Sequence, residues 1–197
     1  MKIFRAFAAL SICVATISTA QAAPISYAGT LNSGVTSFGD VPFQSFRTPG
    51  SWDYWLFAGN AGDVISITAN RTSDQMDPGV ILYAGVGADS AGLGFINPGN
   101  STDGLLTFLA FNDDGGSNVP PGPFFNSLIS NFSLTSTGLF TIAVFDVLGA
   151  ATGPWTYGVT VSGATGTMGT IPEPTTFALA GLALAGLMLG NRRKQAG

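Results

Sequence analysis

The chain has 197 residues, a formal net charge of −4 and no histidine, which excludes Ser-His-Asp triads, histidine-ligated metals and histidine general bases. Its single cysteine, Cys13, lies close to the N-terminus, so a disulfide framework and cysteine-ligated metals are excluded from the rest of the chain. Between residues 23 and 170, Arg47 and Arg71 stand against ten aspartates, a net charge of −8 that argues against nucleic-acid binding.

The first 22 residues contain the three parts of a secretory signal peptide in the expected order. Lys2 and Arg5 form a short positive region, residues 6–20 are apolar, and Ala20-Gln21-Ala22 offers the small residues of a cleavage site. We therefore expect the export machinery and a signal peptidase to act on residues 1–22. Residues 23–170 would remain as one domain of roughly 150 residues, long enough to bury a sizeable core.

Short runs with period-2 alternation predict that residues 23–170 form strands. The clearest runs are DVISITAN (63–70), GVILYA (79–84), LLTFLAFN (105–112) and YGVTV (157–161). LFTIAVFDV (139–147) is apolar on both faces and predicts a central strand that is covered on both sides. Glycine- and proline-rich turns separate the runs, so the predicted fold class is all-β, an antiparallel, jelly-roll-like β-sandwich.

Aromatic residues in SWDYWLF (51–57) form the first candidate binding site. Alternation puts Trp52 and Tyr54 on one face and Trp55 and Phe57 on the other, which we expect to be the core face. If Trp52 and Tyr54 face solvent, their rings could stack on a carbohydrate. The alternative is ordinary packing between neighbouring strands.

Acidic residues in two turn regions form the second candidate. Asp77 lies in SDQMDPG, and Asp113 and Asp114 lie in FNDDGGSN. Carboxylates on glycine-rich turns suit Ca²⁺, although the spacing is not that of an EF-hand loop. The alternative is that these aspartates cap turns through their own backbone. No other cofactor is indicated.

Residues from about 46 to 163 resemble the bacterial pre-peptidase C-terminal (PPC) domain. The resemblance implies a jelly-roll-like β-sandwich of the kind found beside secreted proteases and on surface proteins, with no catalytic residues to carry over. This chain departs from the pattern in its long loops 89–103 and 119–123, and it carries no accompanying catalytic domain. The matching positions are Asp53, Trp55, Phe57, Ala61-Gly62-Asp63, Asp77-Pro78, Leu82-Tyr83, Asp113-Asp114, Thr137-Gly138, Gly153 and Tyr157.

The C-terminal segment, residues 171–197, has the composition of a short membrane anchor. Sixteen uncharged residues run from Thr175 to Gly190, and as a helix they would span about 24 Å of a bilayer core about 30 Å thick. We place a transmembrane helix at 175–191, with the basic cluster behind it on the cytoplasmic side. The body would then lie outside the inner membrane.

The motif Pro172-Glu173-Pro174, the apolar helix and the cluster Arg192, Arg193 and Lys194 together resemble the PEP-CTERM sorting signal of Gram-negative bacteria. The resemblance implies recognition by an exosortase-type protease, removal of the tail, and delivery to the cell surface or extracellular matrix. It also implies association with exopolysaccharide and biofilm formation.

Together these features predict an exported, non-enzymatic protein with a structural or adhesive role in contact with exopolysaccharide. Two alternatives remain open: a dedicated carbohydrate- or calcium-binding module, and a secreted hydrolase that uses aspartates. A hydrolase would need two carboxylates on either side of a cleft, which a sequence cannot reveal.

Overall fold

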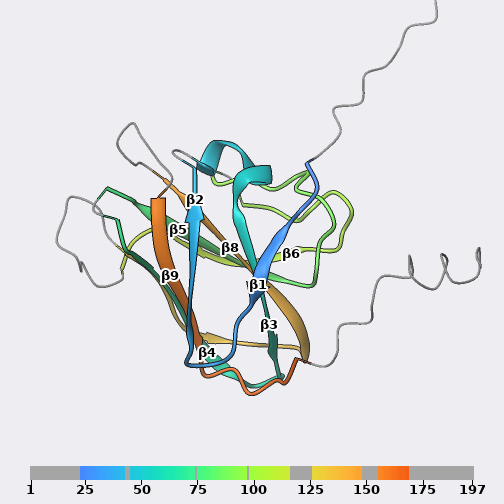
Figure 1. Ribbon diagram of the computed structural model, residues 1–197. Helices are drawn as coiled ribbons and strands as arrows, with labels where there is room; N and C mark the ends of the chain where they lie inside the picture. Colours follow the sequence, from blue (N-terminus) through green and yellow to red (C-terminus); the bar gives the residue numbers. More distant parts are fainter. Residues whose placement is uncertain are drawn as a thin grey trace, which may run out of the picture.

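The computed structural model describes residues 23–42, 45–73, 75–96, 98–115, 126–147 and 155–168. These residues form a two-layered β-sandwich (Figure 1). The predicted signal peptide, residues 1–22, and the predicted sorting segment, residues 171–197, lie outside them. The elements in chain order are β1 (Tyr27–Thr30), β2 (Thr36–Val41), the 3-10 helices η1 (Ser45–Arg47) and η2 (Pro49–Ser51), β3 (Asp53–Gly59), β4 (Val64–Arg71), β5 (Pro78–Ala84), β6 (Thr107–Asn112), β7 (Ser127–Ser133), β8 (Gly138–Asp146) and β9 (Trp155–Ser162).

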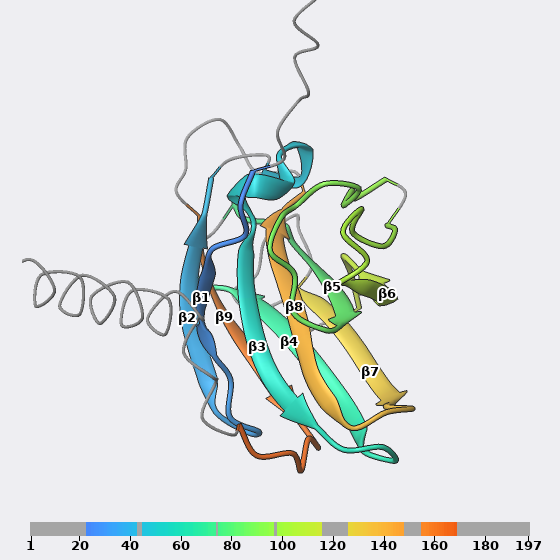
Figure 2. The same cartoon turned by 90° about the vertical axis from the view of Figure 1, so that its right-hand side faces the viewer.

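The strands divide between a five-stranded sheet, in the order β1-β3-β8-β5-β6, and a four-stranded sheet, in the order β2-β9-β4-β7. All pairings in the two sheets are antiparallel except that of β1 with β3, which is parallel. The strands of the two sheets face each other along the length of the sandwich (Figure 2). The structure thus confirms the all-β sandwich that alternation and turn spacing predict.

The main core lies between the sheets, and β8 and β9 show how the sequence builds it. In β8 each of the seven residues from Phe140 to Asp146 is buried, and the strand sits in the middle of the five-stranded sheet, as predicted. In β9 every second residue, Tyr157, Val159 and Val161, points into this core. The inner cluster also contains Trp55, Phe57, Ile65, Ile67, Val80, Leu82, Phe140, Ile142 and Val144.

A second hydrophobic cluster covers the opposite face of the five-stranded sheet. The two 3-10 helices and residues 85–96 and 98–106 lie over this face (Figure 2), and the side chains beneath them are buried. Trp52 stacks on Phe145 with ring centroids 4.7 Å apart, and Phe95 packs edge-on against Phe145 at 5.5 Å. We call this the outer cluster: Trp52, Tyr54, Ile81, Tyr83, Leu93, Leu106, Ala143, Phe145 and Val147.

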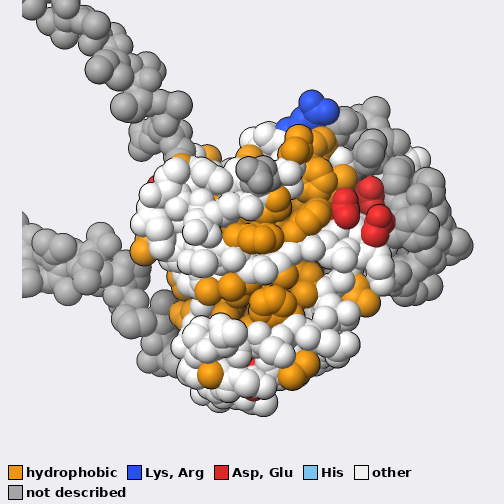
Figure 3. All heavy atoms as spheres, turned by 180° about the vertical axis from the view of Figure 1, so that it is seen from behind, with side chains coloured by type: hydrophobic (Ala, Val, Ile, Leu, Met, Phe, Trp, Pro, Cys, Tyr) orange, Lys and Arg blue, Asp and Glu red, His pale blue; other side chains and the backbone are white. Residues whose placement is uncertain are grey.

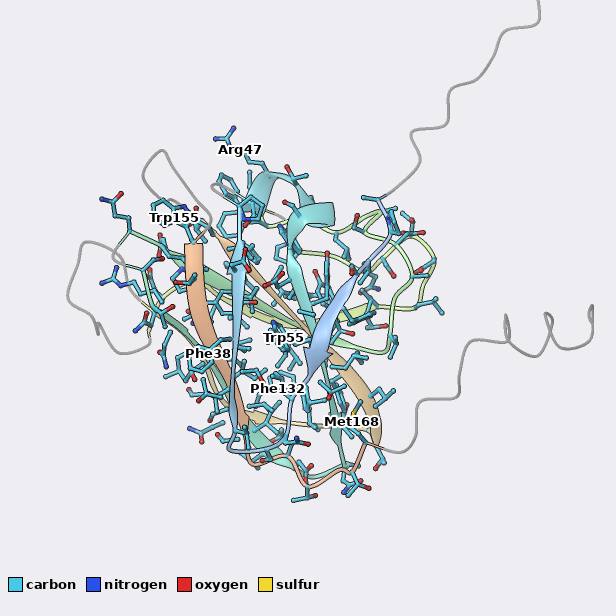
Figure 4. All side chains as sticks on the ribbon, viewed as in Figure 1. Phe38, Arg47, Trp55, Phe132, Trp155 and Met168 are labelled. Atoms are coloured by element: carbon cyan, nitrogen blue, oxygen red, sulfur yellow. The ribbon has the colours of Figure 1, made fainter. Side chains whose placement is uncertain are left out.

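Asp63 secures the C-terminal end of the described chain. Its carboxylate accepts hydrogen bonds from the backbone N–H groups of Asn60 and Thr165, both at 2.8 Å, and from the Thr165 hydroxyl at 2.6 Å. These bonds hold the pKa of Asp63 below its usual range, the Asn60 bond first. Met168 lies at the opposite end of the sandwich from Arg47 (Figure 4).

Strands β4, β5, β6, β8 and β9 lie where the sequence predicts strands, and β3 confirms the alternation expected in SWDYWLF. β1, β2 and β7 were not predicted, because their sequences are polar or interrupted by glycine and asparagine. Within the part of the chain that the structure describes, no helix has the length and apolar character needed to span a membrane. The transmembrane helix expected at 175–191 falls outside those residues.

Candidate functional site

Strand pairing brings the predicted calcium residues to one end of the sandwich. Asp77 immediately precedes β5, whereas Asp113 and Asp114 immediately follow β6. Because β5 and β6 are antiparallel, with Val80 opposite Asn112, the start of one strand lies beside the end of the other. The carboxylates that are far apart in the sequence therefore influence one another electrostatically.

Two further charged residues, which the sequence analysis did not select as site residues, belong to this end. Asp146 is the last residue of β8 and is fully buried; its carboxylate accepts the backbone N–H of Asp77 at 3.0 Å, and its own N–H donates to the Ser45 hydroxyl at 2.7 Å. Arg71, the last residue of β4, is 1% exposed. We call Asp77, Asp113, Asp114, Asp146 and Arg71 the acidic corner.

The acidic corner disfavours the charged form of Asp77. Burial of this carboxyl is the largest cause of its raised pKa, which is about 7. The negative charges of Asp114, Asp113 and Asp146 raise the pKa further, in that order, and the Arg71 guanidinium acts in the opposite direction. The arrangement makes Asp77 a proton-sensitive group near neutral pH.

The corner does not have the arrangement of a metal centre. Among the described residues, no group of three or more histidine, cysteine, aspartate or glutamate side chains is placed to hold a metal ion. The structure therefore gives no support to the predicted calcium site at Asp77, Asp113 and Asp114. At Asp114 the turn is capped by a neighbouring residue and not by an aspartate: the Asn112 side chain accepts the backbone N–H of Asp114 at 2.6 Å.

Of the two possibilities for Trp52 and Tyr54, exposure to solvent is contradicted and packing holds. They are 3% and 1% exposed, because η1, η2 and residues 85–96 and 98–106 cover them. The Trp52 indole N–H donates to the Ser45 carbonyl at 2.7 Å, and the Tyr54 hydroxyl donates to the Pro49 carbonyl at 2.8 Å. Alternation correctly separated the faces of β3, but both faces are buried, so these rings offer no surface for stacking on a sugar.

A buried polar network joins the two sheets. The Trp55 indole N–H on β3 donates to the Tyr157 hydroxyl on β9 at 2.8 Å, and that hydroxyl donates to the Asp53 carboxylate at 2.6 Å. Figure 4 shows Trp55 between the sheets. Burial raises the pKa of Asp53, and the bond from Tyr157 partly offsets it. Gly39 leaves the room required, since a Cβ there would lie 2.5 Å from the Asp53 carboxylate.

An apolar groove of about 570 Å³ lies at the end of the sandwich near η1 and η2. Phe46, Arg47, Pro49 and residues 92–96 line it, and Ile96 is 88% exposed. The Arg47 guanidinium sits 5.0 Å from the centroid of the Phe46 ring. Hydrophobic side chains gather below a basic side chain on the rear face of the molecule (Figure 3). None of the described residues that line this groove is an aspartate or glutamate.

The outward side of the four-stranded sheet differs from all of these regions because it remains open. In β2, β9 and β4 the residues that alternate with the core residues point away from the sandwich, and most are exposed or half-buried. Phe38 on β2 is 69% exposed and was missed by the sequence analysis, because TSFGDV has no alternation of apolar and polar residues that would predict a strand. We call the part of this surface that β2, β9 and β4 form the open face: Thr36, Phe38, Asp40, Val64, Ser66, Thr68, Asn70, Thr156, Gly158, Thr160 and Ser162.

Comparison with known proteins identifies one family feature. Residues 170–194 match the PEP-CTERM protein-sorting motif, which includes Pro172, Glu173 and Pro174 and the basic cluster Arg192, Arg193 and Lys194. No curated protein sequence matches the chain.

Three solved structures are similar in fold. CorA of Methylomicrobium album BG8, described as a surface-associated copper-binding protein important in copper acquisition, has a TM-score of 0.49 and 15% identity over 69% of this chain and 98% of CorA. The pre-peptidase C-terminal domain of collagenase from Bacillus anthracis has a TM-score of 0.42 and 14% identity over 71% of this chain and 97% of that domain. The secreted protein MopE of Methylococcus capsulatus, in which an oxidized tryptophan facilitates copper binding, has a TM-score of 0.45 and 11% identity over 68% of this chain and 86% of MopE.

The chain thus ends in a PEP-CTERM sorting motif, which marks an exported protein that passes through a membrane-anchored stage to the cell surface, with processing by an exosortase.

Proposed function

We propose that this protein is a non-enzymatic component of the surface or extracellular matrix of a Gram-negative bacterium, with a structural or adhesive role in contact with exopolysaccharide and biofilm. The observation that carries the proposal is the sorting motif at residues 170–194 behind a β-sandwich that leaves one sheet open to its surroundings. Residues 23–170 act as the exported body, after a signal peptidase has removed residues 1–22.

The distribution of carboxylates favours a non-enzymatic role over hydrolysis. A hydrolase that works with two aspartates needs them on opposite sides of a substrate cleft. None of the described residues that line the groove near η1 and η2 is an aspartate or glutamate. In the acidic corner, Asp146 is fully buried and already accepts a backbone hydrogen bond from Asp77, so its carboxylate is not placed to reach a substrate.

The experiment that tests the proposal combines location, processing and binding. Cells that express the full chain are fractionated, and the protein in the surface and matrix fractions is examined by intact-mass spectrometry. We expect it there without residues 1–22 and without the segment behind Pro172-Glu173-Pro174. The purified exported protein should also co-sediment with exopolysaccharide isolated from the same cells. Protein confined to the cytoplasm, or absence of binding to that polysaccharide, would contradict the proposal, and mature protein that retains Lys194 would contradict removal of the tail.

A further inference from the structure

The register of the four-stranded sheet lines up the residues of the open face in rows across the strands. Phe38 on β2 lies opposite Gly158 on β9, which lies opposite Asn70 on β4. The next row along the strands contains Thr36, Thr160 and Thr68. Neighbouring strands are about 4.8 Å apart and alternate residues along a strand about 6.6 Å, so the rows repeat at regular spacings across the face.

Phe38 places an aromatic ring at an exposed position where folding does not require an aromatic residue. It is 69% exposed, and it lies over Gly158, where a Cβ would come within 3.1 Å of the ring and 2.9 Å of the Thr36 methyl group. The glycine therefore lets the ring rest against the backbone of β9 while most of its surface stays open (Figure 4). The exposed ring offers a flat apolar surface on which a partner can stack.

The residues around Phe38 offer neutral hydrogen-bonding groups. The Thr36 and Thr160 hydroxyls are 2.8 Å apart, and hydroxyls paired in this way keep acceptor lone pairs for a further partner. Asn70 adds an amide in the same row as Phe38. Among the residues of the open face, Asp40 alone carries a charge.

We infer that the open face binds a neutral polysaccharide chain, with Phe38 stacking on a sugar ring and the threonine and asparagine side chains bonding to sugar hydroxyls. Charge supports this ligand class, because a body with a net charge of −8 repels polyuronates and nucleic acids. A protein partner is less well matched, because the central part of a protein interface is mostly apolar and this face is mostly hydroxyl. The inference rests on the proposed contact with exopolysaccharide and names the surface that makes it.

The test uses the exported protein purified from cells and affinity electrophoresis in gels that contain a soluble neutral glucan, either dextran or laminarin, or the neutral fraction of the cells' own exopolysaccharide. Alginate serves as the acidic counterpart. We expect the wild-type protein to be retarded by a neutral polymer and not by alginate. Phe38→Ala should weaken this binding roughly tenfold or more, as for an aromatic residue at the centre of a contact, and Phe38→Tyr should retain it.

Two further variants separate the open face from the rest of the surface. Gly158→Ala keeps Phe38 but places a methyl group against its ring, so it should also weaken binding. Ile96→Ser removes a comparably exposed apolar side chain from the groove and should bind as the wild-type protein does. Circular dichroism and thermal melting verify that each variant is folded.

The outcomes distinguish the inference from the proposed function. If the wild-type protein co-sediments with the whole exopolysaccharide but binds none of the neutral polymers, the inference fails and the proposed function stands. If it binds neither, the proposed contact with exopolysaccharide fails and the inference with it. If the wild-type protein binds but Phe38→Ala binds equally well, the open face is not the binding surface, and the proposed function stands. Stronger binding to alginate, or a Phe38-dependent shift to dimers in size-exclusion chromatography, would likewise overturn the inference.

Discussion

The two sheets of this sandwich differ in how far the rest of the chain covers their outward faces. The five-stranded sheet is covered on both faces, by the inner core on one side and by the outer cluster on the other. The four-stranded sheet is covered on its inner face, and Phe38, Thr36 and Thr156 are exposed on its other face. The difference suggests that the first sheet provides most of the stability and that the second provides the surface on which a partner can act.

The largest expected effect contrasts two aromatic residues, one on each sheet. Trp52→Ala should destabilise the protein by about 3–5 kcal/mol, because it leaves a cavity beside Phe145 in the outer cluster. Phe38→Ala on the open face should change stability by no more than about 0.5 kcal/mol. Urea denaturation of both variants measures the contrast. Similar losses would show that the outward sides of the two sheets do not differ in the way described.

A smaller effect concerns the network that joins the sheets. Tyr157→Phe removes the hydroxyl that bonds to both Asp53 and Trp55, so it should cost about 1–3 kcal/mol. Tyr83→Phe is the matched control, because the buried Tyr83 hydroxyl has no hydrogen-bond partner within the described chain. Its removal should be neutral or slightly stabilising in the same denaturation assay. If Tyr83→Phe were as destabilised as Tyr157→Phe, the loss of stability would come from packing and not from the network.

The next effect depends on pH and concerns the acidic corner. The pKa of Asp77 is about 7 in the folded protein, above the ordinary value of an unfolded aspartate. Between about pH 4 and pH 7 the folded state therefore holds a proton that the unfolded state has lost, and stability falls as the pH rises. Asp77→Asn should remove this decline, so its melting temperature should exceed that of the wild-type protein by a few degrees at pH 8 and by little at pH 4.

Asp63→Asn provides a control of opposite sign. Hydrogen bonds hold the pKa of Asp63 below its usual range, so its contribution is present above the unfolded pKa and is lost as the pH falls. The variant should melt below the wild-type protein at pH 7, and the difference should shrink in acid. Parallel pH profiles for the wild-type protein and Asp77→Asn would contradict the assignment of the raised pKa to Asp77.

The smallest expected effect is that of calcium. Because the acidic corner lacks the arrangement of a metal centre, added Ca²⁺ and chelator should give the same melting temperature at pH 8. The assay needs millimolar metal, since extracellular calcium modules often bind with Kd values of about 10⁻⁴ to 10⁻³ M. A clear increase with Ca²⁺ that disappears in Asp113→Asn together with Asp114→Asn would restore the calcium site predicted from the sequence.

The sequence predicted the strands that carry strong alternation and missed those that do not. β8 was predicted as a central strand because both of its faces are apolar, and β4 and β9 because isoleucine or valine alternates with serine, threonine or glycine. β2 was missed because its sequence is mostly polar and contains Gly39 and Asp40. Phe38, the residue that marks the open face, was missed with it. Edge strands depend on their neighbours more than on their own composition.

The sequence could not decide between the alternatives for a site where they depended on segments without periodicity. Alternation gave the correct face for Trp52 and Tyr54, but it could not show that residues 85–96 and 98–106 lie over that face. Likewise, the sequence shows Asp146 only as one polar residue at the end of the apolar run of β8. Its burial beside Asp77 follows from the pairing of β5 with β8. Such contacts are set by tertiary packing, which local pattern does not encode.

Hydroxyl-radical footprinting of the exported protein with and without bound neutral polysaccharide tests the central claim most directly, because it reports several exposed apolar side chains in one sample. Phe38 on the open face and Ile96 in the groove are 69% and 88% exposed, so both should be oxidised in the free protein. The account predicts that polysaccharide protects Phe38 and leaves the oxidation of Ile96 unchanged. Protection of Ile96 with Phe38 still fully oxidised would contradict it and would place the binding surface at the groove.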